Sequence, residues 1–474
     1  MSVIAEEATK KNRTVIDQHG QTYELTGRVG EGGQGIVCTT NYPNVLVKIV
    51  RTTTKDQSVF WMDKICSLMR QPLNGLPIAH PLALIVKPQP GYVMELMDGL
   101  VPIASMMQTS QDSLRSDSGL TGYIETGGLL RRLKLLARLA RVFADLHGRG
   151  LAYGDLSDSN VFISKSLEYS EVWLIDADNI SSFSRESLRV WSPDYGAPEI
   201  VRGESGINTL TDSWSFAVLA YYLLNTVHPL KGDGVIEGEH ELEETALRGE
   251  LPWVDHHTDR RNELTVGIPR EITLNTPLKN LFEQCFNAGL NEPGERPSLN
   301  EWADAFELAS AQCDECSSCK STFFFNSKHI CPFCDNIQDK EHTLLLHEYR
   351  YMPPELLREG LTDDVPEPLI LKECWTRTDK FIVLNIAPMD LKTLPWGTSL
   401  YADATPLCTL QLERDGMWIE PSSSAKISLQ RASDDKVVPI SKKQRLKSES
   451  KSATSFWLHL GSIEEEHVVW RFIW

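Results

Sequence analysis

Short runs of apolar and β-branched residues near the start of the chain predict β-strands. Three such runs cover residues 23–29, 36–40 and 45–50. A cluster of glycines separates the first two runs, and an Asn-Tyr-Pro-Asn turn separates the last two. The chain should therefore open with strands that are joined by tight turns.

Helical spacing of apolar residues replaces this pattern further along the chain. Residues 59–69 have it, and residues 129–147 form a clear amphipathic helix with Leu133, Leu136 and Leu139 along one side. Helical and loop segments then alternate to about residue 310, and strand-like runs return at 381–384 and 468–472. We expect an α+β protein with a β-rich C-terminal domain.

Composition narrows the range of partners. The 474 residues are 41% hydrophobic and carry a formal net charge of −18. Such a charge argues against nonspecific binding to nucleic acid or to an anionic membrane, because both need a local excess of Lys and Arg. The first residues lack a long apolar stretch, and the longest apolar run, 216–224, is too short to span a bilayer. We expect a cytoplasmic protein.

A glycine-rich segment is the first candidate for chemistry. The sequence Gly30-Glu-Gly32-Gly-Gln-Gly35-Ile-Val37 lies between two strand-like runs, so its backbone could close over phosphates without Cβ clashes. Thirteen residues past Gly35, Lys48 lies inside an apolar strand. A lysine there commonly faces solvent, but after a glycine-rich hairpin it could hold phosphate groups.

Oxygen ligands follow in the middle of the chain. Asp155 and Asn160 belong to the segment Tyr-Gly-Asp-Leu-Ser-Asp-Ser-Asn, and Asp176 opens the triplet Asp-Ala-Asp after a strand-like stretch. Phosphoryl transfer needs a carboxylate that orients the attacking hydroxyl and oxygen ligands for Mg²⁺. Asp155 fits the first role, and Asn160 and Asp176 fit the second.

The order of these segments resembles the eukaryotic-type protein kinase superfamily over roughly residues 22 to 310. Further landmarks are the segment Ser-Pro-Asp-Tyr-Gly-Ala-Pro-Glu at 192–199, Asp212 in Asp-Ser-Trp-Ser-Phe, and Arg296 before a proline. The resemblance implies a bilobal kinase fold that uses ATP with Mg²⁺ or Mn²⁺ to phosphorylate proteins. The Ala-Pro-Glu segment, which shapes a peptide platform in the family, argues against a small-molecule substrate.

The resemblance also implies individual roles. Lys48 would hold the α- and β-phosphates, Asp155 would be the catalytic base, and Asn160 and Asp176 would be Mg²⁺ ligands. Glu199 and Arg296 resemble the family's buried ion pair, and Asp212 resembles the anchor of the catalytic loop. Nucleotide contacts would come from the glycine loop and a hinge-like segment: Gly30, Gly32, Gly35, Val37, Met94, Glu95 and Met97.

Several departures from the family pattern bear on activity. Gly154 and Ala177 replace the Arg of the HRD triplet and the Phe of DFG, and Ser157 replaces the lysine of the catalytic loop. These changes keep a catalytically weak pseudokinase scaffold as an alternative to an active enzyme. Ser192 could hydrogen-bond Asp155 as in Ser/Thr kinases, which favours Ser/Thr as acceptors.

One partner of Lys48 is missing from its usual place. The helix after that lysine should supply a glutamate, but no Glu occurs between Arg51 and Met94. Asp63, fifteen residues past Lys48, is the candidate substitute. An equally good interpretation makes Asp63 a surface acid.

Cysteine distribution points to metal. Five of the ten cysteines lie between Cys313 and Cys334, which in a chain of this kind indicates metal rather than disulfides. Two CxxC turns that face each other would give Zn²⁺ four thiolates in a closed structural site. Cys313 could replace Cys319 in pairing with Cys316, and His329 could replace one thiolate. The preferred ligands are Cys316, Cys319, Cys331 and Cys334.

These patterns predict a layout in five parts: a tail at 1–12, the two kinase lobes at 13–97 and 98–310, a zinc ribbon at 311–340, and a β-rich domain at 341–474 with a mobile loop at 422–455. A kinase followed by a zinc ribbon resembles bacterial eukaryotic-like Ser/Thr kinases. That resemblance implies a phosphatase and a von Willebrand-type domain protein as partners beside the protein substrate.

Overall fold

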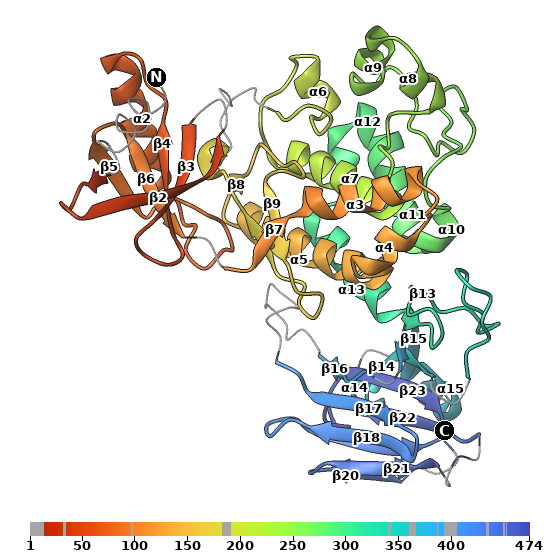
Figure 1. Cartoon of the computed structure of the whole chain (residues 1–474). Helices are drawn as coiled ribbons and strands as arrows, with labels where there is room; N and C mark the ends of the chain where they lie inside the picture. The colour runs from red at the N-terminus through yellow and green to blue at the C-terminus, as the bar shows by residue number, and fades with distance from the viewer. Residues whose placement is uncertain are drawn as a thin grey trace. The chain divides into compact units, whose positions relative to one another are not determined.

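The computed structural model describes residues 14–31, 35–95, 98–182, 191–339, 343–359, 366–385, 387–392, 405–432, 436–448, 451 and 453–474. The chain forms two compact units (Figure 1). The first contains the residues up to Gly127, Arg138–Ile268 and Lys279–Ala303, and the second contains Gly128–Ala137, Pro269–Leu278 and Asp304–Trp474. No helix among the described residues has both the length and the apolarity to cross a membrane.

Six antiparallel strands form a closed barrel at the start of the first unit, in the order β1-β2-β3-β4-β6-β5 (Figure 1). Side chains of β4 alternate between two cores. Val47 points into the barrel, whereas Leu46 and Val50 pack towards a helix, α2. Lys48 shares the face of Leu46 and Val50, because alternate residues of a strand point the same way. The strands are β1 Thr14–Asp17, β2 Thr22–Glu31, β3 Gly35–Thr40, β4 Val45–Val50, β5 Ala83–Lys87 and β6 Gly91–Glu95.

Helix α2 (Lys55–Leu68) begins after Thr54, whose side chain accepts a hydrogen bond from the backbone N–H of Gln57. This cap satisfies one of the free donors of the first turn. Ile65 and Leu68 are the buried positions of the helix. Ile65 packs into the same cluster as Leu46 and Val50 of the barrel.

Helices dominate the rest of the first unit. The long helix α7 is nearly apolar all round, and Trp214 and Phe216 within it are fully buried, as expected of a central helix. Short strands pair beside these helices: β7 Leu100–Pro102 and β10 Val172–Leu174 flank β9 Val161–Ser164, and β8 Leu151–Ala152 pairs with β11 Ser181–Ser182. The longer helices are α3 Ile103–Arg115, α5 Gly128–Gly148, α7 Thr209–Asn225, α9 His240–Leu247, α11 Thr276–Glu283 and α13 Leu299–Ala311. Shorter ones are α4 Thr121–Glu125, α6 Pro198–Val201, α8 Asp233–Glu237 and α12 Gly289–Asn291. Helix α10 Arg270–Thr273 belongs to the second unit, as do parts of α5, α11 and α13.

Two antiparallel sheets make up most of the second unit. A sheet of six strands has the order β15-β14-β23-β22-β19-β20, and a sheet of four has the order β16-β17-β18-β21. The bounds are β14 Leu344–Tyr351, β15 Trp375–Leu384, β16 Met389–Leu391, β17 Cys408–Glu413, β18 Gly416–Pro421, β19 Ile427–Arg431, β20 Val437–Ile440, β21 Gln444–Lys447, β22 Ser455–His459 and β23 His467–Ile473. Two short helices, α14 Pro354–Glu359 and α15 Glu367–Glu373, precede β15.

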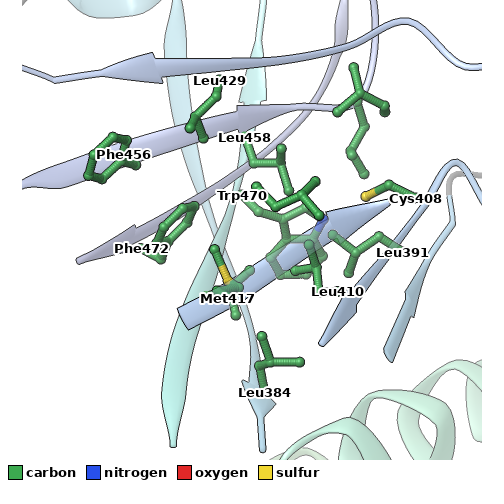
Figure 2. Packing of buried hydrophobic residues seen from close by; sticks show 14 of the residues in the cluster. Leu384, Leu391, Cys408, Leu410, Met417, Leu429, Phe456, Leu458, Trp470 and Phe472 are labelled. Atoms are coloured by element: carbon green, nitrogen blue, oxygen red, sulfur yellow. The ribbon is translucent and has the colours of Figure 1, made fainter. Parts of the chain in front are cut away.

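A single apolar core joins the two sheets. Leu458 and Trp470 come from the six-stranded sheet, and Leu410 and Met417 come from the four-stranded sheet (Figure 2). The period of two along each strand sends one set of side chains inward, so the other face of the six-stranded sheet carries a different set. The predicted α+β class and the β-rich C-terminal region are confirmed.

The prediction of a mobile loop at 422–455 is wrong, because β19, β20 and β21 lie inside it. Ile427, Leu429 and Ile440 reach the core between the sheets. Among the described residues of this segment, Lys442 and Lys443 are exposed, and Ser428 alternates with Ile427 and Leu429 along β19.

Candidate active site

Lys48 of β4 is the centre of a buried ionic cluster in the first unit. Its ammonium lies 2.7 Å from Oδ1 of Asp176 and 2.6 Å from Oδ2 of Asp178. Burial opposes the charged form of Lys48, but the charges of Asp178 and Asp176 outweigh it and raise the pKa of the lysine. Lys48 is therefore held as a cation between two carboxylates.

The two carboxylates differ in exposure. The side chain of Asp176 is 31% exposed, whereas that of Asp178 is 1% exposed. Asp178 also accepts a hydrogen bond of 2.9 Å from the hydroxyl of Tyr92, a fully buried residue of β6. Burial raises the pKa of Asp178, and the nearby Lys48 opposes this rise. Asp178 thus belongs to the interior, and Asp176 faces the open side of the cluster.

Asp155 and Asn160 lie in the loop between β8 and β9. Oδ1 of Asp155 accepts a hydrogen bond of 2.7 Å from Ser192, the contact expected from the sequence, and Oδ2 accepts one of 3.3 Å from Asn179. The amide of Asn160 donates to the backbone oxygen of Asp155 at 2.8 Å. Burial raises the pKa of Asp155, and the bond from Ser192 lowers it.

Asp212 on α7 fixes the backbone of this loop. It accepts hydrogen bonds from the backbone N–H groups of Tyr153 at 2.7 Å and Gly154 at 2.9 Å, and from His147 at 3.0 Å. Gly154 has φ +83°, and a Cβ there would lie 2.6 Å from Ile207. Gly154, which stands where the family triplet has an arginine, adopts this backbone without strain.

Glu199 and Arg296 form a buried bidentate ion pair. The two N–O distances are 2.7 and 2.8 Å, although the residues lie 97 positions apart. Arg296 also donates to the carbonyl oxygen of Gly289 and stacks over Trp214, with 4.8 Å from the guanidinium to the ring centre. The pair ties the short helix α6 to the segment before α13, as the sequence resemblance implied.

The proposed link between Lys48 and Asp63 is wrong. Asp63 is an exposed residue of α2, and within the described part of the chain Lys48 pairs only with Asp176 and Asp178. Lys64, which follows Asp63 on α2, lies closer to the cluster around Lys48. Burial lowers the pKa of Lys64, and the charge of Asp178 opposes this change. Successive residues of a helix are rotated by about 100°, so the side chains of Asp63 and Lys64 point in different directions.

No functional role was predicted from the sequence for Asp178 or Asn179. Asp178 occupies the place of the glycine in the family's DFG triplet, and an acid in place of a glycine was the available signal. Its contact with a lysine 130 residues away could not be derived from local pattern.

The residues proposed for nucleotide contact lie mostly on the barrel. Gly30 is exposed at the end of β2, and Val37 of β3 packs partly against the cluster around α2. Gly35 lies so close to β4 that a Cβ would stand 2.3 Å from the carbonyl oxygen of Ile49. Met94 is buried and Glu95 is exposed at the end of β6. Gly32 and Met97 lie outside the described residues.

Four cysteines converge in the second unit, next to the hairpin of β12 (Cys313–Glu315) and β13 (Thr322–Phe324). The Sγ atoms of Cys316 and Cys334 lie 3.6 Å apart, as do those of Cys319 and Cys331. A zinc ion with Zn–S distances of about 2.3 Å in a tetrahedron would need sulfur atoms about 3.8 Å apart. The donor set and its spacing therefore fit zinc.

Hydrogen bonds favour the thiolate form of Cys316, whereas burial raises the pKa of Cys331 to about 12. Burial opposes ionisation of Cys316, but N–H groups of Cys319 and Ser318 outweigh it and lower its pKa to about 6. Gln338 also donates to the Sγ of Cys316 at 3.2 Å. Cys313 lies apart from the four, with its Sγ 3.5 Å from the carbonyl oxygen of Ala309, and His329 is not among the gathered ligands.

Sequence comparisons relate part of the chain to known protein kinases. Residues 107–306 match the family model of the protein kinase domain. The chain is 36% identical to the serine/threonine-protein kinase pkn2 of Myxococcus xanthus over 110 residues, which are 22% of this chain and 13% of that protein. It is 26% identical to the serine/threonine-protein kinase kin-29 of Caenorhabditis elegans over 256 residues, 52% of this chain and 29% of the other. It is 37% identical to the protein kinase C delta type of Rattus norvegicus over 173 residues, 34% of this chain and 25% of the other.

The chain matches the protein kinase domain at residues 107–306, and this match and the three relatives together support the eukaryotic-type protein kinase superfamily. It spans less than a third of the length of these three relatives. A protein kinase domain implies ATP and Mg²⁺, and the four-cysteine cluster is compatible with zinc.

Proposed function

We propose that the chain is an active, ATP-dependent protein kinase that transfers the γ-phosphate to Ser or Thr residues of a protein. The observation that carries this proposal is the 2.7 Å contact between Lys48 and Asp176, which brings the phosphate-binding cation of the barrel to a candidate metal ligand 128 residues away. Asp155 and Asn160 belong to the loop beside them. The four residues proposed for the reaction are one lysine, two aspartates and one asparagine, which are the types that phosphoryl transfer uses.

In this mechanism Asp176, the more exposed of the two carboxylates, would move away from Lys48 when nucleotide binds. Asp176 and Asn160 would hold Mg²⁺, which supplies charge neutralisation across the phosphates. Lys48 would then direct its ammonium towards the α- and β-phosphates. Asp155 would orient the acceptor hydroxyl and accept its proton.

Asp178 would take over the function of the absent helix glutamate. Because it is buried and also receives the hydroxyl of Tyr92, Asp178 can keep Lys48 in position after Asp176 has turned to the metal. A carboxylate in this place makes Lys48 independent of any acidic residue on α2. The lysine is therefore pre-positioned from within the large lobe, and an active enzyme is compatible with the missing glutamate.

Ser/Thr preference is supported by one contact. Ser192 donates to Asp155 at 2.7 Å, which connects the segment before the Ala-Pro-Glu sequence with the proposed base. A serine or threonine acceptor would approach the carboxylate along this segment. Two of the relatives are named serine/threonine-protein kinases, which points the same way.

The zinc module and β-rich domain would serve partner recognition. The four thiolates would close the coordination of Zn²⁺ and leave no position for catalysis, so the metal would be structural. We retain a phosphatase and a von Willebrand-type domain protein as proposed partners, and the cytoplasm as the proposed location. The domain boundaries given above also stay predictions.

A transfer assay tests the proposed function. Purified full-length protein should incorporate labelled phosphate from ATP into itself or into a generic Ser/Thr protein substrate in the presence of Mg²⁺ or Mn²⁺. The Asp155→Ala variant should lose this activity and still bind ATP. Unchanged transfer in that variant would refute the assignment of Asp155.

The alternative function, a scaffold that binds nucleotide without transfer, is tested by the same experiment. Three departures from the family pattern support this alternative: Gly154, Ser157 and Ala177 stand where the family has arginine, lysine and phenylalanine. ATP binding without transfer under both metals would favour this alternative.

A further inference from the structure

An open cavity lies on the outer face of the six-stranded sheet, away from the core between the two sheets. Its volume is about 420 Å³, within the range of small-ligand sites. Phe325 and His329 come from the segment after β13, and the other lining residues come from the edges and strands of the sheet. Two arginines, Arg377 and Arg471, line the cavity, and none of its lining residues is acidic.

Strand register places the two arginines around one tyrosine. Arg377 on β15 pairs with Tyr349 on β14, and Arg471 on β23 pairs with His347, two positions earlier on β14. All four side chains point to the same face because alternate residues of paired strands do so. The strands thus set the positions of the two arginines, whereas Phe325 and His329 of the segment after β13 complete the wall of the cavity.

Neither arginine is neutralised within the described residues. Arg471 donates to the neutral hydroxyl oxygens of Ser455 at 2.8 Å and Tyr349 at 3.3 Å, and it lies over Trp457. Arg377 contacts only the ring nitrogen of His347, at 3.4 Å. By contrast, Arg350 on β14, whose side chain alternates to the other side, pairs with Glu466.

Two further observations indicate a site for an anion. Burial lowers the pKa of His347, and the charges of Arg377 and Arg471 lower it further, which shows a positive potential at the cavity. Independently, the Nδ1 atom of His329 is buried and has no hydrogen-bond partner in the described part of the chain. A buried polar atom without a partner is uncommon in folded proteins and points to a missing ligand.

We propose that this cavity binds a phosphorylated Ser or Thr side chain of a protein segment. Two guanidinium groups match a phosphate, which carries a charge of about −1.5 to −2 and three acceptor oxygens, better than they match a single carboxylate. Tyr349 would add a hydroxyl donor, and Phe325 would contact the apolar part of the peptide. The choice of phosphoprotein over other anions rests on the proposed function, because a kinase in the same chain produces that group.

Such a site would let the C-terminal domain retain a segment that the kinase domain has phosphorylated. It would also explain why an uncompensated pair of arginines persists in a chain with a net charge of −18. Arginine pairs are a common means of phosphopeptide recognition, since the planar fork binds phosphate oxygens in pairs.

Fluorescence anisotropy with nucleotide-free, full-length protein tests the proposal. The probes are labelled heptapeptides with random flanks and a central phosphoserine, serine or glutamate. We expect binding of the phosphoserine pool, binding at least about tenfold weaker for glutamate, and none for serine. Arg377→Glu and Arg471→Lys should each weaken binding about tenfold or more, whereas Arg350→Glu should not change it.

Three results would overturn the proposal: equal binding of the phosphoserine and glutamate pools, unchanged affinity in both cavity variants, or binding of anionic lipid vesicles in preference to the peptides. Arg377 is exposed, so its substitution should leave the fold intact, and circular dichroism of each variant checks this. The assay contains no ATP, so its failure leaves the transfer activity of the kinase domain unaffected. Conversely, absence of transfer would not alter the measured peptide affinity.

Discussion

The ammonium of Lys48 lies 2.6 Å from a carboxylate oxygen of Asp178, a residue 130 positions further along the chain. We propose that this contact takes the place of the lysine–glutamate pair that the helix after Lys48 would supply in the family. It arises from two facts of the fold: Lys48 faces the α2 side of β4, and Asp178 lies buried in the short turn after β10. The contact leads directly to a test of which acid positions the lysine.

Asp178→Asn should lower kcat/KM for ATP by roughly tenfold to a hundredfold, because a charge-assisted hydrogen bond contributes about 1.5–3 kcal/mol. Asp63→Ala is the matched control and should leave kcat/KM unchanged, since Asp63 is exposed and does not pair with Lys48. Steady-state kinetics of both variants provide the measurement. A loss in Asp63→Ala with normal Asp178→Asn would restore the helix acid as the partner of Lys48.

Ser192→Ala should move the acid limb of the pH–rate profile to higher pH. The bond from Ser192 lowers the pKa of Asp155 against the effect of burial, so its removal lets that pKa rise. A base with a higher pKa is protonated, and therefore inactive, at a higher pH. The kcat/KM profiles of the wild type and the variant show the shift when they extend from neutral pH down towards roughly 3.9, the ordinary pKa of an aspartate. A profile that keeps its acid limb would contradict this account of Asp155.

Glu199→Gln should destabilise the first unit by about 3–5 kcal/mol, because it leaves the fully buried guanidinium of Arg296 without a counter-charge. Glu204→Gln provides the control: Glu204 pairs with Arg202 at the surface, where an ion pair contributes little to stability. Urea unfolding followed by tryptophan fluorescence measures both changes. Similar midpoints for the two variants would show that the buried pair is not a stability determinant.

Cys331→Ser should reduce the zinc content of the purified protein from one equivalent towards zero and lower its thermal stability. Four thiolates would share the proposed zinc ion, so the loss of one would open its site. Cys313→Ser should retain zinc, because the sulfur of Cys313 lies apart from the cluster. Metal analysis by mass spectrometry on chelator-free protein distinguishes the two variants. Zinc loss in Cys313→Ser alone would favour the alternative pairing of Cys313 with Cys316.

The sequence was sufficient where chemistry depends on local order. Spacing of apolar residues predicted a helix at 129–147, and the structure has α5 at Gly128–Gly148. The two CxxC turns identified the four cysteines that gather, because a knuckle is fixed by the few residues between its ligands. Strand periodicity was misjudged at 422–455, where polar residues on one face concealed Ile427 and Leu429 on the other.

By itself, then, the sequence determined the class of protein: glycine loop, lysine, catalytic loop and acidic triplet occur in an order that local physics and family resemblance can interpret. Only the tertiary structure decided which acid holds Lys48 and which arginines share a cavity. Both depend on strand register and on the direction of single side chains. Successive residues of a helix are rotated by about 100°, so the side chains of Asp63 and Lys64 point in different directions. Successive residues of a strand point to opposite faces, so the side chains of Tyr349 and Arg350 lie on different sides of the sheet. Contacts across more than a hundred residues are set by packing, which no local pattern encodes.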